Sequence, residues 1–372
     1  MIFDVIIVGL GASGSSALYH VARSGAKVLG IDQFVPPHHF GSTHSESRIY
    51  RKAYFEGTQY LPLLNRAYSL WSSLENESST TLMYPVGCLT IGPSDSSFIK
   101  QAQTCAKEAN INYLLLSPNE AQKRYPAYQL PDNYKALLDI DAGYIQPEIC
   151  VQTYLRYASI HGAKCLFGNT VTSCVASGNQ VKIITDSQTL VSNKVILTAG
   201  AWIRDFVSIP IEIERVTNSW FQPNGPNCTP SNCPPFIFCD DQGNHSYGCP
   251  DLGAGFKVGL HHKGSTVSHP DNLDRITTLY DVDPVHRVLA NLIPEAAGKY
   301  LKTSVCMYSN LPDHLYLIDY LEGNNPNIII GSACSGHGFK ASSAVGESLA
   351  SLALEHPPPV DLSSFSWKWN NG

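Results

Sequence analysis

The feature that most constrains the fold is a glycine-rich turn, GLGASG, which begins at residue 9 directly after an apolar run. Residues 3–8, FDVIIV, are rich in β-branched side chains, as expected for a buried parallel strand. Gly9, Gly11 and Gly14 follow in G-x-G-x-x-G spacing. In such a turn the first glycine permits a tight bend, the second lets the backbone approach a pyrophosphate, and the third allows a helix to pack closely.

The segments after the turn complete a βαβ unit. Residues 15–25, SSALYHVARSG, predict a helix, and residues 26–32, AKVLGID, predict a second strand that ends at Asp32. Asp32 lies 18 residues after Gly14, where an acid can hold a ribose hydroxyl. We therefore predict a dinucleotide site, with a ligand-free glycine turn as the alternative. The motif does not separate FAD from NAD, but an acid in place of an arginine argues against NADP.

The next segment, residues 36–57, is a polar loop followed by RIYRKAY. We expect a helix there, on which Arg48 and Arg51, three residues apart, share a face. One arginine could then face a cofactor while the other clamps a substrate anion, which the guanidinium geometry favours. The alternative is the solvated basic end of a helix.

Length and composition limit the class of protein. A chain of 372 residues predicts about two or three domains. The net charge of -6 argues against a nucleic-acid binder, and no apolar run is long enough to span a bilayer. The first apolar run ends at Gly9 without a basic region before it, so it predicts a strand and not a signal peptide. Eleven scattered cysteines favour reduced thiols in the cytoplasm and no metal site.

Several separated segments together resemble one known family, that of monomeric sarcosine oxidase and N-methyltryptophan oxidase, with the N-methyltryptophan oxidase branch the nearer. The resemblance covers essentially the whole chain. The segments that carry it are GLGASG at 9–14, PPHHFGSTHSESRIYRKAYFEG at 36–57, AGAW at 199–202, CMYSNLPDHLYLID at 306–319 and SGHGFK at 335–340.

The resemblance implies FAD and not NAD. In this family the flavin is attached covalently through its 8α-methyl group to the cysteine of a C-x-Y-x-N-x-P-D motif. Here Cys306 begins that motif, which continues through Tyr308, Asn310, Pro312 and Asp313. Cys306 would therefore be the flavin tether, although an arbitrary cysteine is more often a structural thiol.

The implied fold class is α/β (α+β). A Rossmann-like FAD-binding domain of the glutathione-reductase/amino-acid-oxidase type would be joined to a substrate domain with a second, mostly antiparallel sheet. Residues 1–82, 147–214 and 306–372 would form the FAD-binding domain. Residues 83–146 and 215–305 would form the substrate-binding domain, and the active site would lie between the two.

The resemblance also assigns roles within the site. Arg51 and Lys340 would bind the substrate carboxylate, and Lys257, with Arg48 on the same side of the flavin ring, would activate O2 by stabilising developing negative charge. His261 would line the pocket more than act as an essential base. His337 would contact the flavin or shape its turn. The further substrate-binding residues would be Tyr247 and Tyr308, and the cofactor-binding residues Gly9, Gly11, Ala12, Ser13, Gly14, Asp32, Gln33, Ser42, Thr43, His44, Arg48, Ala199, Gly200, Trp202, Cys306, Gly336, His337, Gly338 and Lys340.

The chain departs from the family on the substrate side. Where the nearest members commonly have GSHHGDTR, this chain has GSTHSESR, so Ser45, Glu46 and Ser47 replace Gly, Asp and Thr. Cys249 stands where an aromatic residue is usual, and Leu260 and His262 also differ. These changes leave the flavin assignment intact and leave the substrate open.

The expected function is oxidation of a secondary, N-methyl amino acid by a monomeric enzyme. Hydride would pass to FAD, O2 would be reduced to hydrogen peroxide, and the imine would hydrolyse to a primary amino acid and formaldehyde. Two alternatives remain open: an oxidase of a cyclic secondary amino acid such as a pipecolate- or proline-like substrate, and a flavoprotein that binds ligand without turnover. An NAD-linked dehydrogenase would leave Cys306 and Lys257 without a role.

Overall fold

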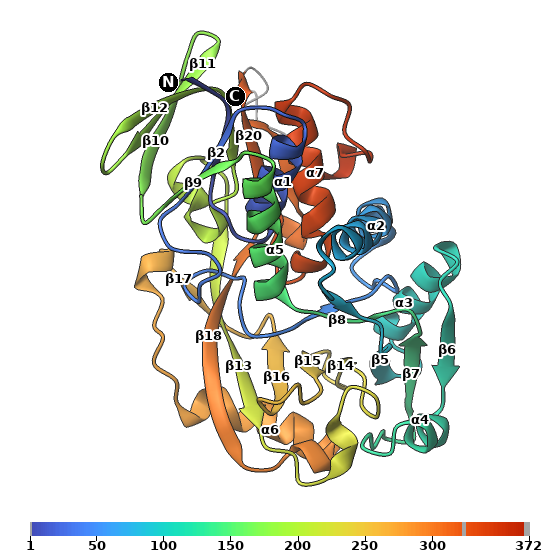
Figure 1. Cartoon of the computed structure of the whole chain (residues 1–372). Coiled ribbons are helices and arrows are strands. Elements are labelled where there is room, and N and C mark those ends of the chain that lie inside the picture. The colour runs from blue at the N-terminus through green and yellow to red at the C-terminus, as the bar shows by residue number, and fades with distance from the viewer. Residues whose placement is uncertain (1, 322–324, 368–372) are drawn as a thin grey trace.

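The structure, a computed structural model, describes residues 2–321 and 325–367. Its strands form two large sheets and a small one, and helices cover the large sheets (Figure 1). None of the helices in the described ranges has the length and apolar character needed to cross a bilayer. A sheet with a parallel centre and a second, largely antiparallel sheet are both present, as the α/β (α+β) fold class predicts.

The first sheet contains the N-terminal strand at its centre. Among the described residues it has eight strands, in the order β10-β11-β12-β1-β2-β9, with β20 beside β12 and β19 beside β20. β1 pairs in parallel with β2 and β12, and β12 with β20. The strands are β1 (Ile2–Val8), β2 (Val28–Asp32), β9 (Lys164–Phe167), β10 (Val171–Ser177), β11 (Gln180–Thr185), β12 (Thr189–Leu197), β19 (Leu317–Leu321) and β20 (Asn325–Ser332).

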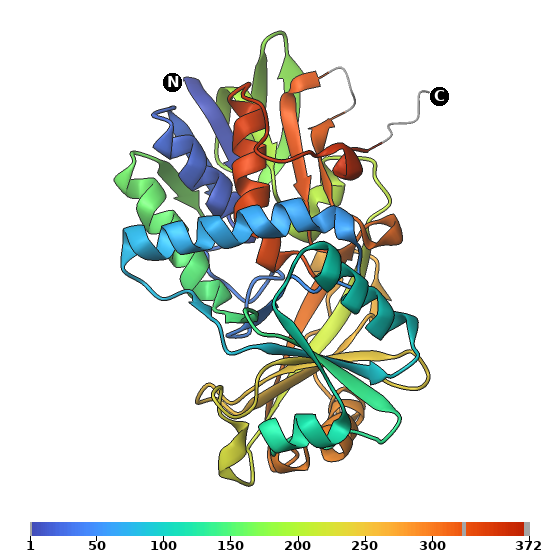
Figure 2. The same cartoon turned by 90° about the vertical axis from the view of Figure 1, so that its right-hand side faces the viewer.

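Helices α1 (Ala12–Arg23), α5 (Pro147–Ile160) and α7 (Ser342–Ala353) pack against one face of this sheet, and α2 (Leu61–Ser78) crosses below them (Figure 2). The predicted helix at 15–25 is thereby confirmed. The apolar side chains of these helices share one buried core with the strands, which includes Leu18 of α1, Ile7 of β1 and Val345 of α7. This core holds the turn after β1 against the rest of the sheet.

The second sheet is antiparallel except where β14 pairs in parallel with β5. Helices α3 (Ser97–Glu108), α4 (Pro118–Arg124) and α6 (Leu279–Leu292) accompany it. In the described ranges its strands are β5 (Cys88–Pro93), β6 (Tyr113–Leu116), β7 (Tyr134–Asp139), β13 (Glu212–Phe221), β14 (Phe236–Cys239), β15 (His245–Cys249), β16 (Phe256–His261), β17 (Ser265–Val267) and β18 (Tyr300–Asn310).

The prediction of a helix at RIYRKAY is wrong. Residues Arg48–Tyr50 form a strand, β3, in a small sheet of order β3-β8-β4, with β4 (Met83–Tyr84) and β8 (Gly143–Ile145). β3 pairs with β8, so that Ile49 lies opposite Tyr144. The β-branched and aromatic side chains of this segment favour a strand once a partner strand is present, and the sequence alone did not reveal that partner.

The predicted domain boundaries stay a prediction. The strands of the first sheet lie within residues 2–32, 164–197 and 317–332, and those of the second within 88–139 and 212–310. The long strand β18 runs across the predicted boundary at 305/306 and pairs with β13 along its length (Figure 1). Residues 1, 322–324 and 368–372 of the predicted FAD-binding domain lie outside the described residues.

Candidate functional site

The turn after β1 has the geometry that its glycines predict. Gly9 has a φ of 89°, and a Cβ there would lie 2.5 Å from the carbonyl oxygen of Thr198. A Cβ on Gly14 would lie 1.8 Å from the carbonyl oxygen of Gly9, so only glycine lets α1 come this close to the turn. At Gly11 the nearest atom to such a Cβ is Thr43 Oγ1 at 3.6 Å, and Gly11 lines a cavity.

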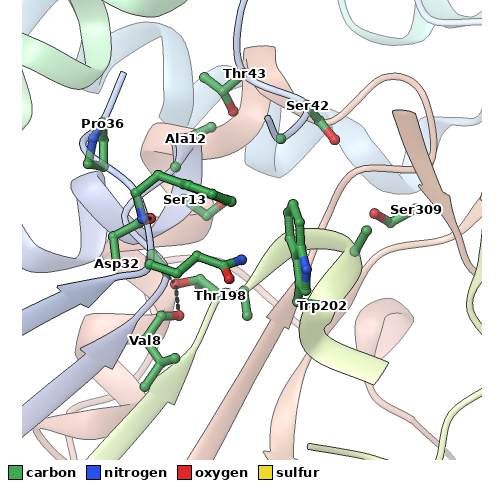
Figure 3. A pocket seen from close by; sticks show the side chains of 18 of the residues that line it. Val8, Ala12, Ser13, Asp32, Pro36, Ser42, Thr43, Thr198, Trp202 and Ser309 are labelled. Atoms are coloured by element: carbon green, nitrogen blue, oxygen red, sulfur yellow. Dashed lines mark hydrogen bonds between the residues drawn. The ribbon is translucent and has the colours of Figure 1, made fainter. Parts of the chain in front are cut away.

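The N-terminus of α1 meets this cavity with unused donors. Gly11, the residue before the helix, has no side chain to accept from the first turn, and that turn has no acidic residue. Ala12 and Ser13 line the cavity (Figure 3). Free backbone N–H groups and the positive end of the helix dipole together suit a phosphate group.

Asp32 lies at the end of β2 and lines the same cavity (Figure 3). Its Oδ2 accepts from the backbone N–H of Leu10 at 2.7 Å, and its Oδ1 accepts from that of Phe34 at 2.8 Å. These two bonds fix the carboxylate, and each oxygen keeps lone-pair capacity for a further donor. The position therefore suits the predicted ribose contact.

A second cavity adjoins the first. The two share lining residues, so they form one elongated space that begins near Asp32 and passes Trp202 before it reaches Lys340. An elongated space of this kind, with the phosphate cradle of Ala12 and Ser13 where the two cavities meet, fits a dinucleotide such as FAD. The shared residues are Ala12, Ser13, Ser42, Thr43, Ala333 and Cys334.

Cys306 lines the second cavity from β18. Its Sγ lies 3.7 Å from the carbonyl oxygen of Ser42, whose hydroxyl donates to the carbonyl of Met307 at 2.8 Å. Arg48 donates to the carbonyl oxygens of Ser42 and Ser47, both at 2.8 Å. Burial raises the pKa of the Cys306 thiol, and the nearby Arg48 guanidinium acts in the opposite direction.

Lys257 is a buried cation on β16 that faces the same space. Its Nζ donates to the carbonyl oxygens of Ser45 at 3.0 Å and Ser47 at 2.6 Å. Ser45 has a φ of 80° and Glu46 a φ of 67°, so the loop turns through a left-handed conformation to present these carbonyls. Burial lowers the pKa of Lys257 to about 8.

Arg51 follows β3 and is almost fully buried. Its guanidinium lies between the rings of Tyr54 and Phe55, 4.7 Å and 4.6 Å from their centroids. It donates to the carbonyl of Ala53 and to both carboxylate oxygens of Glu56, at 2.8 Å and 2.9 Å. Burial opposes the charge on Arg51, but Glu56 acts in the opposite direction together with Tyr54 and Cys88, and the pKa of Arg51 is raised.

One donor of Arg51 remains free. Its Nε is buried and has no hydrogen-bond partner among the described residues. Lys340, in the turn before α7, also lines the cavity, and it donates to Tyr54 Oη at 3.2 Å and to the carbonyl of His337 at 2.7 Å. Because an ammonium has three N–H groups, Lys340 keeps one donor for a ligand. Burial lowers the pKa of Lys340 to about 7.

Aromatic side chains form another part of the wall. Tyr247 Oη donates to Asn218 Oδ1 at 3.0 Å, and His261 Nδ1 lies 3.3 Å from Tyr308 Oη. Burial raises the pKa of Tyr247 and of Tyr308, and it lowers the pKa of His261 well below its ordinary value. All three groups are therefore neutral near pH 7, so the charge of the cavity comes from its arginines, lysines and Glu56.

The structure brings the predicted site residues together. Of all those predicted, Gly14 and His44 are the two that line neither cavity. Gly14 packs behind the turn, and His44 is buried with Nδ1 2.9 Å from Ser45 Oγ. Burial lowers the pKa of His44 to about 3, so its ring is neutral.

Sequence reasoning missed some of the lining. Glu56 lies five residues after Arg51, and an acid so close to a predicted anion clamp was a signal that could have been used. The others arrive from strands whose pairing the sequence does not reveal, or from turns. In the second cavity they are Ile49, Phe55, Asn218, Ile237, Ala333, Cys334, Phe339 and Ser342.

Comparison with known proteins places the chain among flavoproteins. A family model described as FAD dependent oxidoreductase matches residues 4–352. The N-methyl-L-tryptophan oxidase of Salmonella typhi is 32% identical over 367 residues, which are 98% of both chains. That of Yersinia pestis (strain Pestoides F) is 32% identical over 368 residues, 98% of this chain and 99% of the relative.

Solved structures share the fold. NikD, described as an unusual amino acid oxidase essential for nikkomycin biosynthesis, superimposes with a TM-score of 0.88 at 21% identity, covering 98% of this chain and 97% of its own. Glycine oxidase from Geobacillus kaustophilus superimposes with a TM-score of 0.84 at 15% identity, covering 100% of this chain and 99% of its own. At these identities the likeness concerns the fold.

Proposed function

Because this chain belongs to the family of FAD-dependent oxidoreductases, we propose that it is an oxidase of N-methyl amino acids. When bound, FAD supplies the redox chemistry: it accepts a hydride from the carbon next to the substrate nitrogen and passes two electrons to O2. The imine would then hydrolyse to a primary amino acid and formaldehyde. The observation that carries the proposal is the pair of buried cations, Arg51 and Lys340, which both line the cavity and keep N–H donors that no described residue accepts.

Those free donors suit a substrate carboxylate. Arg51 Nε and one N–H of Lys340 can each donate to one oxygen, and charge-assisted bonds of this kind orient an anion strongly. A carboxylate can bind in this way while Arg51 keeps its bonds to Glu56. Glu56 also offsets the positive charge of Arg51 and Lys340, so the empty clamp does not bury two uncompensated cations.

The amine end of the substrate must be neutral before it can lose a hydride, because its lone pair stabilises the new C=N bond. Nearby cations disfavour a protonated amine. Tyr247, Tyr308 and Ile237 supply an aromatic and apolar wall that suits an N-methyl group. His261 is neutral and contacts Tyr308, which suits pocket lining more than a cationic role.

We propose that Lys257 assists the oxygen half-reaction. Two backbone carbonyls hold its ammonium in place, and its third N–H is available toward the cavity. A fixed cation in a site that excludes water stabilises the negative charge that develops when O2 takes up an electron. Arg48, partly buried nearby with a raised pKa, adds a second positive charge.

We propose that Cys306 carries the flavin through an 8α-S-cysteinyl bond. The support is its place in the cavity beside Arg48 and Ser42. Cys334 lines the same cavity and packs against the cluster that contains Cys306, so it is the natural control. We further propose a monomer that works in the cytoplasm; the eleven cysteines are all free, which suits a reducing compartment. Size-exclusion chromatography tests the monomer, and an apparent mass near twice 40.6 kDa would contradict it.

The test of attachment is acid precipitation with intact-mass measurement. We expect the yellow colour to stay with the protein and the mass to include one FAD. The Cys306→Ser variant should release its flavin on precipitation, and Cys334→Ser should retain it. Retention by Cys306→Ser and release by Cys334→Ser would move the tether to Cys334, and release from the unaltered protein would rule out covalent attachment.

The test of the reaction is a screen of N-alkyl amino acids with peroxide and formaldehyde measured together. Equal amounts of both are expected from an N-methyl amino acid. Peroxide without formaldehyde from a cyclic secondary amino acid would show that a ring carbon is oxidised instead. Absence of flavin bleaching under anaerobic conditions with every member of the screen would show a flavoprotein without turnover.

A further inference from the structure

A second layer of side chains lies behind the carboxylate clamp. Tyr54 is 1% exposed and is absent from the lining of both cavities, yet its Oη is one of the two acceptors that hold Lys340 Nζ. The other acceptor is the carbonyl oxygen of His337. The direction of the third N–H of Lys340 is therefore set by groups that a substrate in the cavity does not touch.

The tautomer of His337 follows from its neighbours. His337 Nε2 lies 3.1 Å from the carbonyl oxygen of His314, which can only accept, so Nε2 carries the proton. Burial lowers the pKa of His337 to about 3, so the ring is neutral and Nδ1 is an acceptor. The hydroxyl of Tyr54 lies 2.6 Å from that Nδ1.

One arrangement satisfies the network when Lys340 is charged. The ammonium can only donate, so Tyr54 Oη accepts from it and can direct its own proton to His337 Nδ1. Tyr316 Oη, 2.7 Å from the same Nδ1, can instead donate to the carbonyl of His337 at 3.1 Å.

The backbone turn that supplies the His314 carbonyl to this network has an unusual conformation. Asp313 and His314 have φ values of 56° and 53°, a left-handed conformation that residues other than glycine rarely adopt. This turn aims the carbonyl of His314 at His337, and Tyr60 Oη donates to the same carbonyl at 3.3 Å. Tyr60 is as buried as Tyr54 but makes no bond to Lys340, so it offers a matched comparison.

We propose that Tyr54 is a positioning residue, which acts through Lys340 to hold its ammonium charged and aimed at the substrate carboxylate. This inference rests on the proposed function, because it assumes that an anion binds at Lys340. Tyr54 stabilises the charged form by accepting from it, and the Nε2–H tautomer of His337 leaves Tyr54 free to do so.

Other charges act on Lys340 as well and must stay constant in a test. Burial lowers its pKa most, Glu56 raises it, Arg51 lowers it and Cys88 raises it. Lys340 in turn acts on the neighbouring rings of His261 and His337. A Tyr54→Phe substitution removes one acceptor from the ammonium and leaves every one of these groups in place.

The experiment measures binding of benzoate, a carboxylate that cannot be oxidised, by the change in flavin absorbance between pH 6 and 9.5. In the unaltered holoprotein, affinity should fall as pH rises through the pKa of Lys340, because the neutral amine no longer attracts the anion. In Tyr54→Phe the midpoint of this fall should lie about one pH unit lower, because an acceptor for the charged form is lost. At pH values above both midpoints, benzoate should bind to Tyr54→Phe up to about tenfold more weakly than to the unaltered protein.

Tyr60→Phe is the control for the loss of a buried hydroxyl, and its midpoint should match that of the unaltered protein. Lys340→Met should remove the part of the fall that follows the pKa of Lys340, near 7, and keep any part that follows the pKa of Lys257, near 8. Adding Tyr54→Phe to Lys340→Met should change nothing further, since Tyr54 acts through Lys340. Coincident midpoints in Tyr54→Phe and the unaltered protein, with the lower-pH part of the fall removed by Lys340→Met, would overturn the role of Tyr54 alone. An unchanged fall in Lys340→Met would remove Lys340 from the clamp, and the inference would fail with it.

Discussion

Lys257 is a cation that the fold has taken out of water and given two carbonyl acceptors. Replacing it with methionine keeps the apolar stem and removes the charge. We expect flavin reoxidation by O2 to slow by about 100-fold or more, the size expected when one preorganised electrostatic group is lost. Reduction by substrate should change far less. Anaerobic and aerobic stopped-flow measurements separate the two half-reactions.

The same cation predicts a pH dependence for reoxidation. Because the pKa of Lys257 is lowered to about 8, its charge is complete at pH 6 and lost as pH rises above 8, so reoxidation should slow in that range. Lys302→Met is the control: Lys302 pairs with Glu46 of the neighbouring loop but is 48% exposed. Equal slowing of reduction and reoxidation in Lys257→Met would refute the role in oxygen chemistry.

Substitution of Glu56 tests how burial of an ion pair changes its contribution to stability. Glu56→Gln leaves Arg51 buried without its counter-charge, so the free energy of unfolding should fall by about 3 kcal/mol. The comparison is Glu347→Gln. Glu347 makes a similar two-point contact with Arg66, but Arg66 is 41% exposed, and the loss should be at most about 1 kcal/mol. Denaturant unfolding measures both, and equal losses would contradict the difference.

At the scale of single residues, the sequence predicted the charged side chains of the site better than the groups that hold them in place. The cations Arg51, Lys257 and Lys340 were predicted from the resemblance, whereas the acceptors that hold them were not. Ser45 and Ser47 contribute carbonyl oxygens, which any residue possesses, so residue type carries no signal for them. Tyr54 acts from behind Lys340 through contacts that depend on the path of the loop.

Two glycines in the turn between β1 and α1 have different roles: Gly14 permits close packing of α1, and Gly11 leaves space for the cofactor. A Cβ at Gly14 would meet the carbonyl of Gly9 at 1.8 Å, so Gly14→Ala must push α1 away from the turn. We expect a loss of about 1–3 kcal/mol in the free energy of unfolding. A Cβ at Gly11 meets no atom closer than 3.6 Å, so Gly11→Ala should fold normally and lose FAD instead.

Thermal unfolding and the flavin-to-protein absorbance ratio distinguish the two variants. Gly11→Ala should keep the melting temperature of flavin-free protein while its flavin content falls, because the added methyl group enters the space for the pyrophosphate. Full flavin content in a stable Gly11→Ala protein would show that the cofactor does not approach this part of the turn.

Elements with strong local patterns were predicted well, and those defined by distant partners were not. The apolar run before Gly9 is β1, and the helix predicted at 15–25 lies within α1 except for its last two residues. β3 is three residues long, and its conformation depends on pairing with β8, which lies about 95 residues further along the chain. A helix and a short strand both tolerate the sequence RIY, so tertiary pairing decided between them.

Across the whole molecule, buried histidines predict a loss of stability in acid. Burial lowers the pKa of His20 to about 4 and that of His44 and His337 to about 3. In the unfolded chain each takes up a proton near pH 6.5, so below that pH the unfolded state binds more protons and stability falls with pH. The slope reaches about 1.4 kcal/mol per histidine and pH unit only well below pH 6.5, so going from pH 6.5 to pH 5 should cost roughly 5 kcal/mol for the three histidines.

Urea unfolding of the holoprotein at several pH values checks this expectation. His20 lies among Tyr19 and Tyr154, and its Nε2 has no partner in the described part of the chain, so His20→Leu should remove about a third of the slope. His356→Leu, at an exposed position, should leave the slope unchanged. A flat profile between pH 6.5 and 5 in the unaltered protein would contradict the expectation.

The strand order of the first sheet also affects how the protein folds during its synthesis. β1 emerges first from the ribosome, yet its neighbour β12 begins at Thr189, and β20 beside β12 begins only at Asn325. Strands that are so far apart in the sequence pair slowly, so apolar strands stay unpaired and exposed during synthesis. Nascent chains arrested near residue 300 should therefore retain no FAD. FAD should therefore bind late, when the chain is nearly complete. Cells that make the protein faster than they supply flavin should accumulate folding intermediates that depend on chaperones.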